Sequence, residues 1–320
     1  MNPRTPGVSL VMMAADDPSR HPPSRGFWHT ARALGRQWAP VVAEQAGIRK
    51  AEEPVAASGG IPERDAWESA AFGALWMGQA TTLLRVGGQT VLTDPHFAEH
   101  AGVSIAGKPT GRRRSIALPG EVHDLPPVDV LVLTHAHMDH WHKPTLERLV
   151  SPATTVVVPH HTRRLLPQRG RGFGNVIELR WEEQEDLDGV GVTAWPCKHW
   201  GARYLIDRHR GYNAYIIEDD SRRLLFAGDT ADTHHFDELQ QIETAILGIG
   251  NSYAPWDRVH ATPEQAAAMA ERMGAARIMP IHHSTFHDAG EPVGEALDRV
   301  KKVWSPRNVI CEDIGAAHLE

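Results

Sequence analysis

The segment T-H-A-H-M-D-H-W-H, residues 134–142, gathers metal-ligating side chains in one short stretch. Its strongest ligands are His135, His137, Asp139 and His140. The apolar run Val128–Leu133 before them predicts a buried strand, so the ligands are expected on the loop at its carboxyl end, where open α/β sheets place their chemistry. Residues two apart in an extended loop point to the same side, so His135 and His137 can share one ion. Asp139 and His140 are then able to turn towards a second, which predicts a metal-dependent hydrolase.

Other interpretations of these residues exist. In a chain with 20 histidines some clustering arises by chance, but a cluster at a strand end with an aspartate inside it favours a metal site. Three later candidates, His199, Asp229 and His282, each follow an apolar, strand-like segment. Taken singly, they could be a surface histidine, a turn or capping aspartate and a core histidine. Their shared position after strands favours a common function.

The segment 134–142 resembles the H-x-H-x-D-H signature of the metallo-β-lactamase superfamily, and the three later candidates stand in the order in which that superfamily supplies its other ligands. The resemblance implies an α/β fold, the αββα sandwich of two mixed β-sheets flanked by helices. It also implies two zinc ions, with manganese or iron as alternatives, which supply a hydroxide nucleophile from a shared water. Seven residues would bind the ions: His135, His137 and His199 at one, Asp139, His140 and His282 at the other, and Asp229 at both.

A narrower resemblance follows from residues 75–81, L-W-M-G-Q-A-T. They are similar to the W-x-G-H-A-T element of the branch that contains the N-acyl-phosphatidylethanolamine-hydrolysing phospholipase D and its bacterial relatives. Further matches, among them Leu92–Pro95 and His199–Arg203, extend the likeness over roughly residues 70–300. It implies cleavage of a phosphodiester, in an N-acylethanolamine phospholipid or a similar substrate. Two alternatives stay open: a lactone or amide hydrolase with the same metals, and a non-catalytic binding protein stabilised by zinc.

The chain departs from this branch at three positions. Gln79 stands where the family element has histidine, so a neutral amide must make whatever contact that histidine makes. His142 stands where an aspartate commonly braces the ligand loop, and His283 replaces a tryptophan. Residues around metal ligands orient them and tune metal affinity, so these changes leave the substrate open.

Several residues are candidates for catalysis or substrate contact. The catalytic candidates are Asp139 and Asp229, which act through the metals, and His260, which could assist the leaving group. The candidate substrate contacts are Tyr253, Gln79 and Trp200. His260 and Tyr253 could equally flank helices or lie in the core, and Trp200 could equally be a packing residue.

Composition sets limits on the partners. With 320 residues, 41% of them hydrophobic, the chain can bury a large core as one domain. A formal net charge of −7 argues against nucleic-acid binding, which needs a basic surface. The two cysteines, Cys197 and Cys311, make no disulfide framework and favour a reducing cytoplasm, with pairing between them left open. We expect a small-molecule or lipid substrate, no transmembrane segment, and a homo-oligomer as an open alternative.

The predicted organisation is an N-terminal tail and linker over residues 1–66 and a hydrolase domain over residues 67–320. Within Ser24–Lys50, apolar residues at helical spacing predict an amphipathic helix. That helix could rest on an anionic membrane surface as a peripheral contact, although packing on the domain is favoured.

The sequence of residues 67–320 predicts alternating strands and helices. Helices are expected at Lys143–Val150, His161–Gln168, Thr233–Gln241, Pro263–Met273 and Val293–Val303. Strands are expected at Ala74–Trp76, Thr82–Val86, Thr90–Thr93, Val128–Leu133, Thr155–Val158, Val176–Leu179, Val192–Trp195, Asn213–Ile217, Leu224–Ala227, Ala245–Ile249, Ile278–Ile281 and Val309–Cys311.

Overall fold

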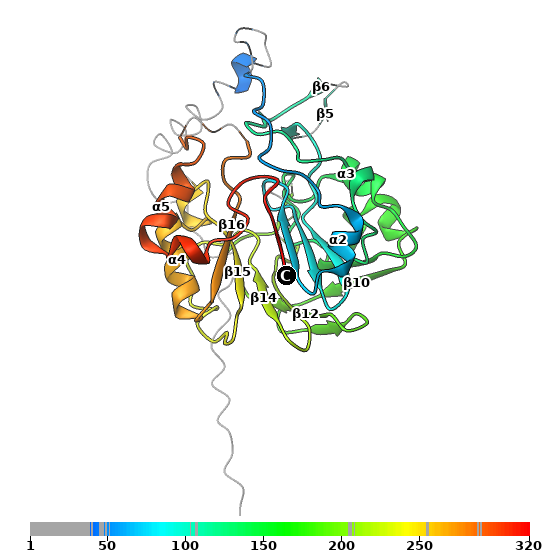
Figure 1. Cartoon of the computed structure of the whole chain (residues 1–320). Helices are drawn as coiled ribbons and strands as arrows, with labels where there is room; N and C mark the ends of the chain where they lie inside the picture. The colour runs from blue at the N-terminus through cyan, green and yellow to red at the C-terminus, as the bar shows by residue number, and fades with distance from the viewer. Residues whose placement is uncertain are drawn as a thin grey trace, which may run out of the picture.

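The computed structural model describes residues 52–320 apart from 103, 106–107, 204–206, 208, 254–255, 287 and 289, together with residues 39, 41–44, 48 and 50. Two large mixed β-sheets form the centre of the molecule. Figure 1 shows helices α4 (Pro263–Arg272) and α5 (Glu295–Val303) outside one sheet and α2 (Arg64–Ser69) and α3 (Lys143–Arg148) outside the other. The expected αββα sandwich is therefore confirmed.

The first sheet has seven strands in the order β10-β9-β8-β3-β2-β1-β17. Strands β3, β8, β9 and β10 run parallel, whereas β1 pairs antiparallel with β2 and with β17. The parallel strands read as short apolar runs because both faces of the sheet are covered. The bounds are β1 Gly73–Trp76, β2 Thr82–Val86, β3 Gln89–Thr93, β8 Val130–Val132, β9 Thr155–Pro159, β10 Asn175–Leu179 and β17 Ala317–Leu319.

The second sheet has six strands in sequence order, β11-β12-β13-β14-β15-β16. Strands β14, β15 and β16 are parallel, and β11 to β14 pair antiparallel in turn. Strands β12, β14 and β16 consequently point in one direction and end at the same edge. The bounds are β11 Gln184–Asp186, β12 Gly191–Trp195, β13 Ala214–Glu218, β14 Arg223–Phe226, β15 Thr244–Gly248 and β16 Arg277–Ile281.

The core has three apolar layers. Between the sheets, Trp76 and Val132 of the first pack in one cluster with Tyr215 and Phe226 of the second. A second cluster lies under α4 and α5, and a third covers the outer face of the first sheet near α2 and α3. Burying such large side chains on both faces of each sheet stabilises the sandwich, at about 25 cal/mol per Å² of apolar surface.

Short elements connect the layers. Two small two-stranded sheets are formed by β4 (His100–Ala101) with β7 (Arg112–Arg113) and by β5 (Ser104–Ile105) with β6 (Lys108–Pro109). The 3₁₀ turns are η1 Val122–Asp124, η2 Arg163–Leu165, η3 Pro167–Gly170, η4 Trp256–Arg258 and η5 Pro306–Asn308.

Three predicted helices and eleven predicted strands are confirmed to within a few residues. Helix α4 begins with the capping box expected from its sequence: Thr262 accepts from the amide of Gln265, whose side chain accepts from the amide of Thr262.

Three predicted elements are wrong. The segment His161–Gln168 forms the turns η2 and η3 rather than an α-helix, because Pro167 lacks an amide hydrogen and Gln168 adopts a left-handed backbone, φ 48°. Thr233–Gln241 forms turns that Arg272 holds through its bond to Asp237. Val309–Cys311 makes only a single bridge, between Val309 and Ile278, and the last strand is β17 instead.

The structure describes only part of the predicted N-terminal tail and linker, residues 1–66. Most of Ser24–Lys50, with its predicted amphipathic helix, lies outside the described residues. The boundary predicted between residues 66 and 67 falls inside α2, and the segment before it contacts the domain where Val55 bridges Ile116. Among the described residues, no helix has the length and apolar character needed to cross a membrane.

Candidate metal centre

The seven candidate ligands come together at one edge of the sandwich. The first four lie on the loop after β8, as the sequence predicted, and His199 lies on the loop after β12. Asp229 and His282 follow β14 and β16, which end at the same edge. The strand directions therefore bring to one place residues that are far apart in the chain.

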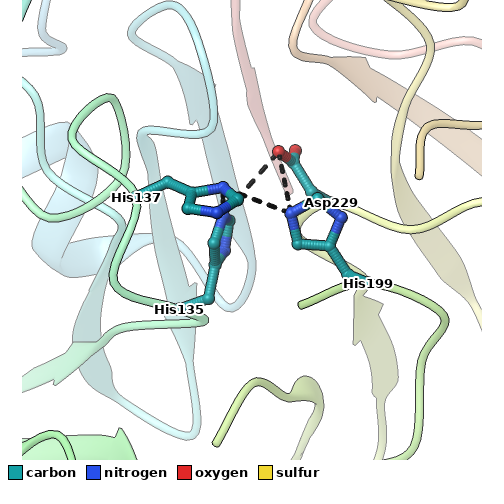
Figure 2. Close-up of side chains that lie close together, drawn as sticks. All are labelled: His135, His137, His199 and Asp229. Carbon is teal, nitrogen blue, oxygen red and sulfur yellow. Dashed lines mark hydrogen bonds and ion pairs between the residues drawn. The ribbon is translucent and has the colours of Figure 1, made fainter. Parts of the chain in front are cut away.

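One group consists of His135, His137, His199 and Asp229, whose ligand atoms all lie within 4.8 Å of one another. Figure 2 shows their side chains turned towards one another, two from the loop after β8 and two from loops that follow strands of the second sheet. Nδ1 of His137 lies 2.8 Å from Nε2 of His135 and 3.3 Å from Nε2 of His199. Both of those Nε2 atoms lie 3.8 Å from Oδ2 of Asp229. Three imidazoles and a carboxylate suit zinc.

A second group consists of Asp139, His140 and His282, and Asp229 closes it. Nε2 of His140 and Nε2 of His282 lie 3.6 Å and 3.4 Å from Oδ2 of Asp139. Each also lies 3.2 Å from a carboxylate oxygen of Asp229. Donors bound to zinc at about 2.1 Å in a tetrahedron are about 3.4 Å apart, so these spacings fit a metal ion.

Buried atoms without a hydrogen bond provide a further test of whether this cluster fits a metal ion. Nε2 of His140 and Oδ1 of Asp229 are buried and, apart from their ion-pair contacts at 3.2 Å, have no hydrogen-bond partner within the described part of the chain. A buried polar atom without a partner costs about 1–3 kcal/mol, so such atoms need an explanation. A cation between the two side chains would supply the missing interaction, and the donor set therefore fits a metal.

Burial and charge prepare the ligands for a cation. Burial holds the pKa of His135 and of His199 well below the usual value, so their rings are neutral, as metal binding requires. Burial alone would raise the pKa of Asp229, but the imidazoles of His140 and His282 outweigh it and hold that pKa well below its usual value. Burial would lower the pKa of His140, but the carboxylates of Asp229 and Asp139 raise it well above the usual value, so this ring carries a proton that metal binding would displace. The carboxylates thus remain ionised and attract positive charge.

Hydrogen bonds behind the ligands set their orientation. Oδ2 of Asp94 lies 2.7 Å from Nδ1 of His140, and the amide of Thr134 donates to Oδ1 of Asp94 at 2.7 Å. Nδ1 of His199 donates to the carbonyl of Val259 at 3.0 Å, which leaves its Nε2 for the cluster. The sequence interpretation did not assign a role to Asp94. Its signal was the T-D-P sequence after β3, at the carboxyl end of a strand parallel to β8.

The cluster opens into a cleft with a volume of about 290 Å³. His137, Asp139, His199, Asp229 and His282 line it, whereas His135 and His140 lie deeper. The other walls include Gln79, Arg112, Trp200, Trp256, His260 and Phe286. A cleft with polar groups at its base and aromatic walls is the usual form of a small-molecule site.

The remaining candidates occupy different places. His260 reaches the cluster, with Nε2 3.1 Å from Oδ2 of Asp229, and Trp200 packs edge-on against His137 with ring centroids 4.8 Å apart. Gln79 contacts the second group directly. Tyr253 is directed elsewhere, because its hydroxyl donates to Oε1 of Glu295 on α5 at 2.8 Å.

The two other residues that depart from the family pattern, His142 and His283, each contact a neighbouring element. His142 caps α3 by accepting a hydrogen bond from the amide of Thr145. His283 is buried and stacks on Trp76, with ring centroids 4.4 Å apart.

Curated relatives cover most of the domain. The chain is 28% identical over 242 residues to a protein of Mycobacterium tuberculosis named as uncharacterized, with 73% of this chain and 64% of that protein covered. It is 28% identical over 263 residues to the N-acyl-phosphatidylethanolamine-hydrolyzing phospholipase D 1 of Caenorhabditis elegans, with 75% and 71% covered. A metal-dependent hydrolase of Methanospirillum hungatei is 25% identical over 244 residues, with 74% and 94% covered. The chain thus spans about two thirds of the length of the first two relatives.

Solved structures share the fold at low identity. An isothiocyanate hydrolase from Delia radicum gut bacteria matches with a TM-score of 0.63 at 19% identity, covering 78% of this chain and 98% of its own. A diiron β-hydroxylase from Streptomyces venezuelae matches with a TM-score of 0.52 at 20% identity, covering 72% and 50%. The fold therefore accommodates different reactions.

The family model described as the beta-lactamase superfamily domain matches residues 89–283, more than half of the chain. This range contains all seven candidate ligands. The chain belongs to the beta-lactamase superfamily.

Proposed function

We propose that the protein is a di-zinc phosphodiesterase that acts on an N-acylethanolamine phospholipid or a similar lipid. The observation that carries the proposal is the pair of donor groups that share Asp229 at the base of a cleft. The similarity to a phospholipase D of Caenorhabditis elegans over 263 residues supports the phosphodiester.

The proposed metal sites divide the seven residues into two sets. His135, His137 and His199 would hold one ion, and Asp139, His140 and His282 the other, with Asp229 between them. When bound, such a pair lowers the pKa of water towards neutrality and stabilises charge on the oxygens of a scissile phosphate. Zinc is proposed because imidazole and carboxylate donors at tetrahedral spacing suit it.

His260 has a proposed role in proton transfer. The ionised carboxylate of Asp229 accepts a hydrogen bond from Nε2 of His260 at 3.1 Å, so one proton stays on that nitrogen. Nδ1 is buried and has no hydrogen-bond partner among the residues that the structure describes. His260 also lines the cleft, which makes it the candidate to assist the leaving group.

The cleft walls suit a lipid with a charged head. Trp200, Trp256 and Phe286 give apolar surface on which an acyl chain can lie. Arg112 also lines the cleft, where its guanidinium bonds Asp288 at 2.7 Å and Asn251 at 3.2 Å. Guanidinium groups recognise phosphate oxygens well, which makes Arg112 a candidate contact for the headgroup.

Substrate comparison tests the proposal. Purified protein with quantified metal should be assayed against an N-acylated phospholipid, a generic phosphodiester, an acyl lactone and a chromogenic β-lactam, each with and without chelator. We expect chelator-sensitive cleavage of the phospholipid. Cleavage of the lactone or β-lactam alone would replace the proposal with a carbonyl hydrolase, and two bound ions without any turnover would favour a zinc-stabilised binding protein.

We also infer action in a reducing cytoplasm, because the thiols of Cys197 and Cys311 are both free and buried. Contact with a membrane surface would bring a lipid substrate to the cleft. Fractionation of cells that express the native chain tests both inferences: recovery outside the cytoplasm would contradict the first, and absence from the membrane fraction the second.

A further inference from the structure

The backbone of Gln79 is held tightly beside the second donor group. Its amide donates to the hydroxyl of Thr285 at 2.6 Å, and its carbonyl accepts from the indole of Trp76 at 3.0 Å and from the amide of His282 at 2.8 Å. The residue has a left-handed backbone, φ 52°, and is only 4% exposed. These contacts aim its side chain in one direction.

That direction is into the second donor group. Nε2 of Gln79 lies 2.6 Å from Oδ2 of Asp139 and 2.6 Å from Nε2 of His282. An amide NH₂ has two hydrogens: one meets Oδ2 of Asp139, and the other meets Nε2 of His282 in the tautomer that carries its proton on Nδ1. With the amide reversed, its oxygen would face the oxygen of the ionised carboxylate, so the electrostatics favour the nitrogen in this position.

The two acceptors are the atoms that a cation would use. Oδ2 of Asp139 and Nε2 of His282 lie 3.4 Å apart, at metal-ligand spacing. The lone pair of an amide nitrogen is delocalised into the carbonyl group and is not offered to a metal, so the NH₂ group and the cation compete for the lone pairs of Asp139 and His282. The NH₂ group of Gln79 therefore competes with an ion for this position.

The first donor group has no such competitor. His137 contacts the other two histidines of that group, His135 and His199, and no amide side chain bonds their ligand atoms within the described residues. A cation entering there displaces only contacts among the ligands themselves. The two positions therefore differ in what must be broken when metal binds.

We propose that Gln79 makes the second metal position, formed by Asp139, His140 and His282 with Asp229, the weaker of the two. This inference rests on the proposed metal pair and concerns how it fills. Metal binding at the second position must break two hydrogen bonds of Gln79, whereas the first position fills without this cost. The protein then holds one ion at low metal concentration and two at higher concentration.

Metal titration tests the inference without using activity. Metal-free protein should be titrated with zinc against a chromophoric chelator and by calorimetry, as wild type and as Gln79→Met, which keeps side-chain length and removes the donor. We expect two steps in the wild type, with the second at least about ten-fold weaker. Removing two hydrogen bonds should tighten that step about ten-fold or more and leave the first unchanged.

Two further variants complete the design. His282→Ala should abolish the weaker step, which assigns that step to the second position. Gln89→Met is the matched control, because Nε2 of Gln89 also bonds two acceptors, the carbonyls of Leu187 and Asp188, at a distant site. It should leave both steps unchanged, and melting of each metal-free variant checks that it is folded.

The outcomes separate this inference from the proposed function. A weaker second step in Gln79→Met would overturn it and make the amide oxygen a metal ligand instead. An unchanged second step, or an equal effect of Gln89→Met, would also overturn it while leaving the metal pair intact. Wild-type protein that binds no metal would overturn both proposals together.

Discussion

The carboxylate of Asp94 lies 2.7 Å from Nδ1 of His140, and both side chains are completely buried. Asp94 also accepts from the amide and from the hydroxyl of Thr134, at 2.7 Å and 2.5 Å. An acceptor at Nδ1 keeps that nitrogen protonated and directs Nε2 of His140 towards Asp139 and Asp229. Asp94 thus positions His140 within the candidate metal centre.

Asp94→Asn should weaken metal binding at the second position by about 10–100-fold, because an amide holds the imidazole of His140 less firmly than a carboxylate does. Zinc titration measures the affinity, and melting of the metal-free variant checks folding. Asp129→Asn is a suitable control, since Oδ2 of Asp129 accepts from the amide of Thr90 away from the centre. Equal metal affinity in Asp94→Asn and wild type would contradict the positioning role.

Asp229→Ala should deplete both ions and abolish turnover, because this one carboxylate contributes to both donor groups. Elemental analysis and the phosphodiester assay measure the two effects. Asp232→Ala is the nearby control: it removes an ion pair with Arg272 at 2.9 Å that is partly exposed and contributes about 1 kcal/mol or less. Retained turnover in Asp229→Ala would show that the carboxylate does not join the two positions.

Removal of metal should lower the melting temperature as well as the activity. A ligand that binds only the folded state stabilises it by about 2.7 kcal/mol at one hundred times its Kd. Without the cation, the carboxylates of the centre repel one another and its buried atoms without a hydrogen bond lose their partner, which destabilises the folded state. Thermal melts with chelator, and after zinc is restored, measure the change. A melting curve indifferent to zinc would argue against a bound ion in the folded protein.

Tyr253→Phe distinguishes two roles for a residue that the sequence offered as a substrate contact. Its hydroxyl donates to Glu295, so loss of the hydroxyl should destabilise the protein by about 1–2 kcal/mol and leave the KM unchanged. Urea unfolding and steady-state kinetics give the two quantities. A raised KM with unchanged stability would instead support substrate contact.

Stability should depend on pH through Glu264. The fork of Arg299, with contacts of 2.9 Å and 2.7 Å, lowers the pKa of this carboxyl to about 2 from a usual 4.5. Because the folded pKa is the lower one, the stabilisation is complete above about pH 4.5 and declines as the pH falls towards 2. The side chain is 45% exposed, so water screens the pair and its contribution is about 1 kcal/mol or less.

Glu264→Gln should therefore be less stable than wild type at pH 7, and the difference should shrink as the pH falls below 4.5. Urea unfolding at a series of pH values measures it. Glu271→Gln on the same helix serves as the control, because no ion pair of Glu271 exists within the described chain. A difference between Glu264→Gln and wild type that stays constant down to pH 3 would show that the ion pair is not its source.

Local sequence determined many of the strands, the ligand loop and the start of α4. The apolar run before residue 134 predicted a buried strand, and the H-x-H-x-D-H spacing after it predicted the ligand loop. The box of Thr262 and Gln265 predicted where α4 begins, since both partners lie within one turn. These signals were readable because their interactions join residues close together in the chain.

Long-range packing decided the rest. Whether His199, Asp229 and His282 met at one place depended on β12, β14 and β16 pointing in the same direction, which no local pattern states. The helix expected at Thr233–Gln241 was replaced by turns bonded to Arg272, a residue on a different element. Tertiary contacts outweigh helix propensities of a few tenths of a kcal/mol per residue.

Gln79 illustrates both what the local sequence shows and what only the tertiary structure shows. The sequence placed it in a family element and showed that it is an amide where a histidine is expected. Only the folded chain put its nitrogen between Asp139 and His282, residues 60 and 203 positions away. Metal affinity depends on such contacts of a few ångströms, and these exist only after the two sheets have packed together.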